Sequence, residues 1–235
     1  MTAATALKVL IVVTSHAQLG NTSRTTGWYL PEVAHPYYAL TAQGIQVDFV
    51  SPKGGRAPID ESSRSADDAE SVRFLADPLL MNRMENTYRA EEINPKEYRG
   101  IIYAGGHGTM WDFPNDQPLA RLAAEIYENG GVVAAVCHGP AALVNIKLSN
   151  GKYLVDGKKV ATFTEAEEKE AEMIGIVPFV LETKLRERGA RIQLAPNWSE
   201  NVAVDGRLIT GQNPASAARL GTEVVRALKS VPSNR

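Results

Sequence analysis

Short apolar runs alternate with amphipathic stretches along most of this chain. The runs indicate buried strands at residues 7–13, 45–50, 100–104, 132–136, 159–163, 190–194, 201–204 and 207–210. Helical spacing occurs between many of them, at residues 32–43, 118–129, 140–146, 165–174, 178–188 and 214–228. Strands that alternate with helices predict an α/β fold with a mostly parallel sheet and helices on both faces.

Two local patterns predict how the last elements begin. Residues 204–207 have the composition of a two-residue hairpin turn between two short strands. Asn213 followed by Pro214 is typical of a helix start, with Asn213 as the N-cap.

Residues 52–94 break the alternation, because they are rich in charge and lie between two apolar strands. We interpret them as an insertion with helical turns, which could be a lid, an interface or a solvated surface excursion. No linker or internal repeat divides the chain. The sequence therefore predicts a single domain over residues 1–235, with residues 52–94 as an insertion or cap.

Ligands of open α/β sheets bind at the carboxyl ends of the strands. Three loops at such ends contain chemically capable residues: residues 14–32, 105–114 and 137–140. A functional site is therefore expected where these loops meet.

Cys137, the only cysteine of the chain, ends the apolar run 132–136, and Pro140 follows at the start of the next predicted helix. This predicts a nucleophile elbow, a sharp turn from a strand into a helix. The positive end of a helix favours thiolate over thiol. A lone cysteine is more often a small buried apolar residue, but the Cys-His-Gly-Pro context favours a nucleophile here.

A cysteine nucleophile needs a base and an orienting acid. The chain has four histidines, and His138 is the one that follows Cys137, so the base is His138 or an upstream group. Glu165, Glu167 and Glu168 are candidate orienting acids for His138. At least two of the three are expected to be ordinary residues of a solvated helix face.

The Gly-Gly-His-Gly stretch at residues 105–108 could supply backbone N–H groups to a reacting oxygen, and its spacing is not that of a dinucleotide-binding motif. His107 could line the pocket, and Asp112 could hold this loop through hydrogen bonds. Glu32 could be either a protonated buried carboxyl that donates to the thiolate or a surface acid at a helix start. Gly139 and Trp28, beside these motifs, are further pocket candidates.

Composition narrows the class of protein. The 235 residues carry a formal net charge of −2 without a basic block, which argues against a nucleic-acid surface. A single cysteine excludes an intrachain disulfide and fits a reducing compartment. No apolar run reaches membrane-spanning length, so we expect a cytoplasmic protein. No metal motif is present, although Glu32 and His35 share a helix face.

The three loops together resemble the ThiJ/PfpI (DJ-type) superfamily, which is flavodoxin-like and related to class I glutamine amidotransferase domains. Residues 105–108 with Asp112 and Pro114, residues 135–140 and the ending 211–216 are similar to its branch of heat-shock chaperones and glutathione-independent glyoxalases, the glyoxalase III group. The resemblance implies that Cys137 is the nucleophile, His138 its partner, Glu32 the buried glutamate and Glu168 the third member of a triad. It also implies oxyanion N–H groups from Gly106 and His138, a homodimer and no cofactor.

The implied activity is a glyoxalase III reaction, of the lyase type also called D-lactate dehydratase. The Cys137 thiolate adds to a 2-oxoaldehyde such as methylglyoxal, His138 or Glu32 moves the proton through an enediol, and the thioester hydrolyses to lactate. The same chemistry on glycated amines and thiols would give a deglycase. A holdase chaperone of the stress response and a cysteine peptidase or amidase are the alternatives, and the fold alone does not decide among them.

Overall fold

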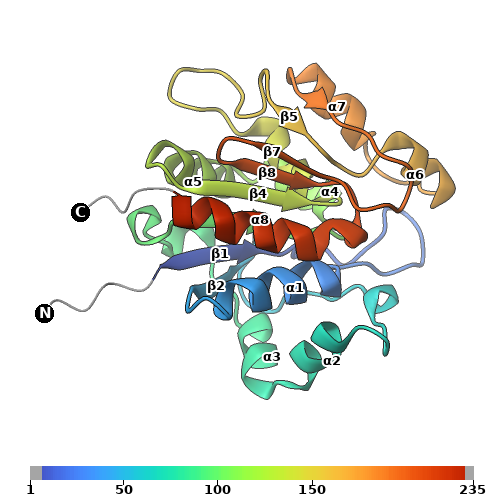
Figure 1. Cartoon of the computed structure of the whole chain (residues 1–235). Helices are drawn as coiled ribbons and strands as arrows, with labels where there is room; N and C mark the ends of the chain where they lie inside the picture. Colours follow the sequence, from blue (N-terminus) through green and yellow to red (C-terminus); the bar gives the residue numbers. More distant parts are fainter. Residues whose placement is uncertain (1–6, 231–235) are drawn as a thin grey trace, which may run out of the picture.

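The computed structural model describes residues 7–230 and is built on a six-stranded sheet in the order β2-β1-β3-β4-β8-β7 (Figure 1). Five strands run parallel: β1 (Lys8–Val12), β2 (Gln46–Val50), β3 (Gly100–Tyr103), β4 (Val132–Val136) and β8 (Leu208–Gly211). β7 (Val202–Asp205) is antiparallel to β8. A separate parallel pair, β5 (Lys159–Val160) and β6 (Arg191–Ile192), lies beyond β7. The predicted mostly parallel sheet is confirmed.

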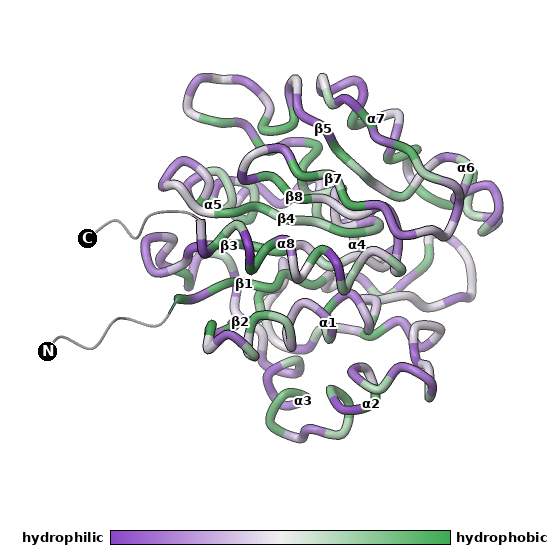
Figure 2. The backbone as a smooth tube through the Cα atoms, in the orientation of Figure 1, coloured by the Kyte–Doolittle hydropathy of each residue, from purple (hydrophilic) through white to green (hydrophobic). Residues whose placement is uncertain are grey.

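Helices cover both faces of the sheet because successive residues of each strand point to opposite sides. Val9 and Ile11 of β1 belong to the core cluster that includes α1 (Leu30–Thr41) and α8 (Ala217–Ser230). Leu10 and Val12 of the same strand belong to a second cluster, under α5 (Gln117–Glu128) and α7 (Leu181–Glu187). Figure 2 shows the resulting apolar centre, with hydrophilic residues in the outer loops.

Residues 52–94 form helical turns, as predicted. The segment contains α2 (Ala69–Ala76), α3 (Pro78–Glu85) and two short 3₁₀ turns, Glu61–Ser63 and Ala90–Glu92; a third, Pro95–Glu97, follows it. Phe74 and Met84 are buried in the same core cluster as α1. The segment is therefore packed onto the α1 side of the sheet (Figure 1). The ends of the predicted domain, residues 1–6 and 231–235, lie outside the described residues.

Several predicted element bounds were wrong. Residues 140–146 form a 3₁₀ turn, Gly139–Asn145, in place of an α-helix, and α6 (Glu165–Glu170) is shorter than predicted. The predicted strand 159–163 pairs only over β5, because the N–H of Phe163 donates to the Cys137 carbonyl oxygen instead of to a strand. The hairpin loop is Gly206 and Arg207, one residue later than the centre of the predicted turn, since Asp205 pairs with Leu208.

The start of the last helix also differs from the prediction. Pro214–Ser216 forms a 3₁₀ turn before α8 begins. The Asn213 side chain does not cap this turn, because its amide nitrogen donates to Glu167 Oε1 and to the Ser199 carbonyl oxygen, each at 2.8 Å. Asn213 therefore ties the start of the final helix to α6.

Candidate active site

Cys137 lies at a strained turn directly after β4. Its φ is 59°, in the left-handed region that residues other than glycine seldom adopt. The Cys137 N–H donates to the Gly211 carbonyl oxygen at 2.9 Å, and its own carbonyl oxygen accepts from Phe163 N–H at 3.0 Å. Because neighbouring chain segments hold both sides of its peptide unit, the elbow conformation is maintained despite the strain.

Gly139 permits this turn by close contact with the backbone of β3. A Cβ atom at Gly139 would lie 2.2 Å from the Tyr103 carbonyl oxygen. Gly139 does not line the pocket described below. Gly139 therefore packs the elbow against β3, and the prediction that it lines the pocket was wrong.

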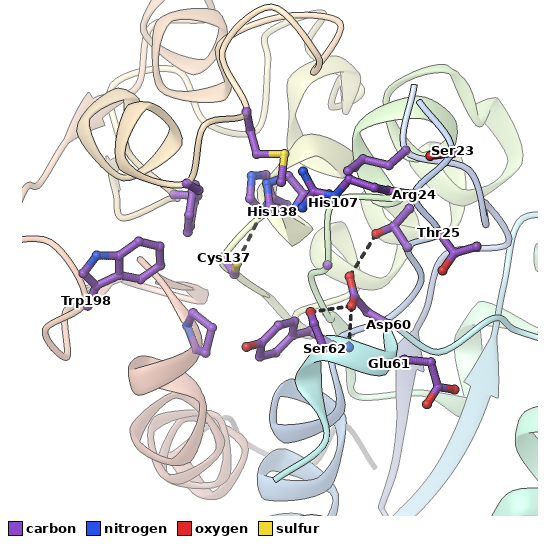
Figure 3. Close-up of a pocket in the computed structure, with 18 residues that line it drawn as sticks. Ser23, Arg24, Thr25, Asp60, Glu61, Ser62, His107, Cys137, His138 and Trp198 are labelled. Carbon is purple, nitrogen blue, oxygen red and sulfur yellow. Dashed lines mark hydrogen bonds between the residues drawn. The ribbon is translucent and has the colours of Figure 1, made fainter. Parts of the chain in front are cut away.

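The side chain of Cys137 begins a chain of contacts through His138 to Glu168. Cys137 Sγ lies 3.3 Å from His138 Nδ1 (Figure 3). His138 Nε2 lies 2.9 Å from Glu168 Oε2. His138 and Glu168 are buried. This is the geometry of a nucleophile, a base and an acid that orients the base.

His107 contacts the same carboxylate from the pocket side. Its Nε2 lies 2.9 Å from Glu168 Oε1, and its ring centre is 4.0 Å from that of His138. Each oxygen of Glu168 is thus occupied by one histidine. His107 lines the pocket, as expected from the sequence, whereas its contact with Glu168 was not predicted.

The pKa values of Glu168 and His138 are both lowered, and this determines which of the two groups is charged. Burial raises the pKa of Glu168, but His138 and His107 outweigh burial and hold that pKa at about 2. Burial, together with His107, lowers the pKa of His138 against the opposing effect of Glu168. At neutral pH the cluster therefore contains a carboxylate and a neutral His138 that can accept a proton.

Glu32 is a buried carboxyl on α1 that faces Cys137. Its Oε2 accepts from the Gly105 N–H at 2.7 Å, and Oε1 has no hydrogen-bond partner among the described residues. Burial raises the pKa of Glu32 to about 8, although the Cys137 thiol and the Gly105 N–H oppose the shift. Burial and then Glu32 raise the pKa of the Cys137 thiol well above its ordinary value. Because two negative charges would repel, the pair holds at least one proton at neutral pH.

The helix-end effect expected from the sequence is therefore not the dominant influence on Cys137, since the following turn is a 3₁₀ turn and burial prevails. Two backbone N–H groups, from Gly106 and His138, act in the direction that favours thiolate. Gly106 has a φ of 97°, and a Cβ there would lie 2.0 Å from the Gly27 carbonyl oxygen. The left-handed conformation of Gly106 lets its N–H face the sulfur, where an oxyanion would form.

A pocket of about 520 Å³ opens beside these groups (Figure 3). Gly106, His107, Cys137 and His138 contribute to its wall. Six of the remaining lining residues lie in the loop 14–32 that the sequence indicated as part of a site, although none was named as a pocket residue. The others come from further segments of the chain. The remaining lining residues are Leu19, Ser23, Arg24, Thr25, Thr26, Tyr29, Asp60, Glu61, Ser62, Phe163, Ala171, Met173, Trp198 and Pro214.

Trp28 lies in the core, not in the pocket for which it was a candidate. It is 1% exposed, its indole N–H donates to the Ala57 carbonyl oxygen, and its ring meets the edge of Phe74. The next residue, Tyr29, lines the pocket. The extended backbone at Tyr29 explains the difference, since neighbouring side chains then point to opposite sides.

The three candidate acids of α6 have separate surroundings, and the expectation that at least two of them lie on a solvated helix face was wrong, because Glu167 and Glu168 are buried. Glu168 contacts the histidines, whereas Glu165 pairs with Lys169 at the surface. Glu167 accepts from the Thr164 N–H and from the side chain of Asn213, so it caps α6 and anchors the final turn. The sequence does contain the signal, because Thr164 with Glu167 three residues later is a capping box.

Asp112, in α4 (Thr109–Asp112), holds its loop through hydrogen bonds, as predicted. Its Oδ2 accepts from the Thr14 hydroxyl at 2.7 Å and from the Ser15 N–H at 2.8 Å. Burial raises the pKa of Asp112 to about 6. The contact joins the loop after β1 to the turn that carries Gly106 and His107.

His107, His138 and Glu168 are also the described residues whose donor atoms could hold a metal ion, since these atoms lie within 4.8 Å of one another. The same atoms already form the hydrogen bonds given above. Glu32 and His35 do not converge, because His35 lies between Asp68 and Glu70 at 2.9 and 3.1 Å.

Comparison with known proteins identifies relatives over nearly the full length. The model of the DJ-1/PfpI family matches residues 25–227. Glutathione-independent glyoxalase HSP31 of Saccharomyces cerevisiae is 34% identical over 238 residues, which are 95% of this chain and 98% of that protein.

Solved structures agree with this relationship. The crystal structure of glyoxalase III from Candida albicans has a TM-score of 0.85 and 28% identity, covering 94% of this chain and 97% of that one. Rapid Encystment Protein 24 kDa from Francisella tularensis has a TM-score of 0.91 and 43% identity, covering 94% and 99%. No helix among residues 7–230 is both long and apolar enough to span a bilayer. The family match, the relatives and the elbow after β4 together place this chain in the DJ-1/PfpI family.

Proposed function

We propose that this protein is a glutathione-independent glyoxalase that converts methylglyoxal and other 2-oxoaldehydes to 2-hydroxy acids. The observation that carries the proposal is the Cys137–His138–Glu168 chain, with its 3.3 and 2.9 Å contacts, at the wall of a pocket of about 520 Å³. The relatives named glutathione-independent glyoxalase and glyoxalase III support the same activity.

The first step forms a bond between Cys137 Sγ and the aldehyde carbon. The thiol proton passes to His138 Nδ1, which is neutral and 3.3 Å away. The aldehyde oxygen takes the negative charge next to the N–H groups of Gly106 and His138, then accepts the proton from His138 Nδ1 to give a hemithioacetal, which leaves His138 neutral again.

The second step moves hydrogen between the two substrate carbons. Glu32 is protonated below a pKa of about 8, so His138 is the base available at neutral pH. It removes the hydrogen of the former aldehyde carbon as a proton, and the electron pair forms an enediolate. The hemithioacetal hydroxyl proton goes to the neighbouring oxygen, and His138 returns its proton to the neighbouring carbon.

The product of this shift is a thioester of a 2-hydroxy acid on Cys137. Water cleaves the C–S bond, giving the acid and the free thiol. The aldehyde carbon is oxidised and the keto carbon reduced within one molecule, so no external oxidant or reductant is required. Glu168 keeps His138 in the tautomer that presents Nδ1 to the sulfur.

The proposal is tested by incubating the purified protein with methylglyoxal, without glutathione and with a chelator, and measuring lactate. We expect lactate from the wild type and none above background from Cys137→Ala. Absence of lactate from reduced, folded wild type would refute the proposal and favour a chaperone or an amidase. Lactate at an undiminished rate from Cys137→Ala would refute the role of the thiol.

A further inference from the structure

The pocket is larger than a three-carbon aldehyde requires. Its volume of about 520 Å³ is in the range that holds drug-sized ligands. The reactive sulfur is on one wall, and residues of the loop after β1 and of the 52–94 segment form part of the rest. The space beyond the thiol therefore accommodates a longer substrate chain.

Most charged groups around this space already have partners. Glu168 is bound by two histidines, and Glu61 pairs with Arg64 at 2.5 Å. Asp60 accepts from the Thr26 hydroxyl at 3.1 Å and from the N–H of Ser62 at 3.0 Å. These acids are therefore engaged within the protein.

Arg24 differs from them. Among the charged side chains that line the pocket, the Arg24 guanidinium is the one without a hydrogen-bond or ion-pair partner in the described structure. Arg24 is exposed, and Figure 3 shows its side chain extending from the loop into the pocket on the side of His107. Ser23 and Thr25 lie on either side of it along the same wall. A planar guanidinium with five free N–H groups matches a carboxylate in geometry and charge.

We propose that Arg24 forms a subsite for a terminal carboxylate, so that the preferred substrates are 2-oxoaldehydes that carry a carboxylate at the far end of a short chain. The inference rests on the proposed glyoxalase function. A monoanion is favoured over a phosphate dianion, because one guanidinium balances one charge and the pocket also contains Asp60 and Glu61.

The chemistry for such a substrate is the same internal redox reaction. For 4,5-dioxopentanoate, Cys137 adds to the aldehyde carbon, hydrogen moves to the keto carbon, and water releases 2-hydroxyglutarate. One water is consumed, and the distant carboxylate is unchanged. The carboxylate only anchors the molecule so that the aldehyde faces the sulfur.

The test compares 4,5-dioxopentanoate with 2-oxopentanal, a neutral probe of equal carbon number. We expect a higher kcat/KM for the anionic probe in the wild type, and the ratio of the two values should fall about tenfold in Arg24→Gln. Arg24→Lys keeps the positive charge but loses the planar pair of N–H donors that can bind both carboxylate oxygens, so it should give an intermediate ratio. Arg56→Gln is the matched control, because Arg56 is an exposed arginine outside the pocket and its loss changes net charge equally.

The outcomes separate the two proposals. Equal kcat/KM for both probes in the wild type would overturn the subsite and leave the glyoxalase function intact. An equal loss for both probes in Arg24→Gln would also overturn it, since Arg24 would then act on the reacting oxygens. No turnover of 2-oxopentanal or methylglyoxal would refute the glyoxalase function itself, and the subsite with it.

Discussion

Glu168 binds both histidines of the site, one with each carboxylate oxygen. A glutamine at this position has one acceptor and one donor, so it cannot hold both imidazoles in their present tautomers. We expect Glu168→Gln to lower kcat for lactate formation by roughly 10²- to 10⁴-fold, the range that a positioned general base contributes, because His138 would lose its orienting acid. Glu170→Gln, on the exposed side of the same helix, is the control. Full activity in Glu168→Gln would show that the reaction does not require the Glu168 carboxylate.

Glu32 lies against Cys137 in a buried site and raises the pKa of its thiol, so thiol reactivity should depend on Glu32. Glu32 raises the pKa of Cys137 after burial, so Glu32→Gln should lower it. The rate of iodoacetamide alkylation as a function of pH should then have its inflection at lower pH in Glu32→Gln than in the wild type. An unchanged or higher inflection would show that the carboxyl does not control the thiol.

At the scale of elements, the sequence predicted β4 and the elbow well, because a five-residue apolar run ending in Cys-His-Gly-Pro has few alternative structures. It did not predict that a 3₁₀ turn follows. That difference depends on the close approach of Gly139 to the Tyr103 carbonyl oxygen, which is a tertiary contact. The sequence does contain a reason to prefer Glu168 over Glu167 as the orienting acid. Thr164 and Glu167 form a capping box, so the Glu167 side chain is occupied at the start of α6.

The turn after β3 allows an experiment that separates backbone strain from close contact. Gly106 and Gly130 both have positive φ, but a Cβ at Gly106 would meet the Gly27 carbonyl oxygen at 2.0 Å, whereas nothing lies within 4 Å at Gly130. We expect Gly130→Ala to lower the free energy of unfolding by about 1–2 kcal/mol from conformation alone. Gly106→Ala should lower it by roughly 3 kcal/mol or more, and should also abolish lactate formation.

Urea unfolding of both variants measures this difference. If the two alanine variants were equally stable, the close packing of Gly106 on Gly27 would not contribute to the fold. If Gly106→Ala kept full activity, its N–H would not be an oxyanion donor.

At the scale of the whole molecule, the buried Glu32 carboxyl should make stability depend on pH. Its pKa is about 8 in the folded protein and 4.5 as its ordinary value, so above pH 4.5 the unfolded chain ionises while the folded protein does not. Its contribution is therefore complete below pH 4.5 and is lost as pH rises toward 8. The stability of Glu32→Gln relative to wild type should increase by on the order of 3 kcal/mol between pH 5 and pH 8.

Chemical denaturation at the two pH values tests this expectation, with Glu85→Gln as the control because Glu85 is exposed. A relative stability of Glu32→Gln that stays constant with pH would mean that Glu32 is ionised in the folded protein.

The general architecture was predictable because strands and helices alternate regularly, and the branch of the family was indicated by motifs at three strand ends. The pocket was not predictable. Arg24, residues 60–62, Met173 and Trp198 meet there only because separate loops pack together, and no local pattern in the sequence records such packing. Trp28 illustrates the same limit, since one step along an extended backbone decides between core and pocket.

The proposed reaction forms lactate through a thioester on Cys137. A trapping experiment tests this step: wild type is mixed with methylglyoxal, quenched in acid during the first turnover and treated with hydroxylamine. We predict lactohydroxamate in an amount that approaches one equivalent per active site, and none from Cys137→Ala. Lactate production without any trapped thioester, or an equal amount of hydroxamate from Cys137→Ala, would contradict the account.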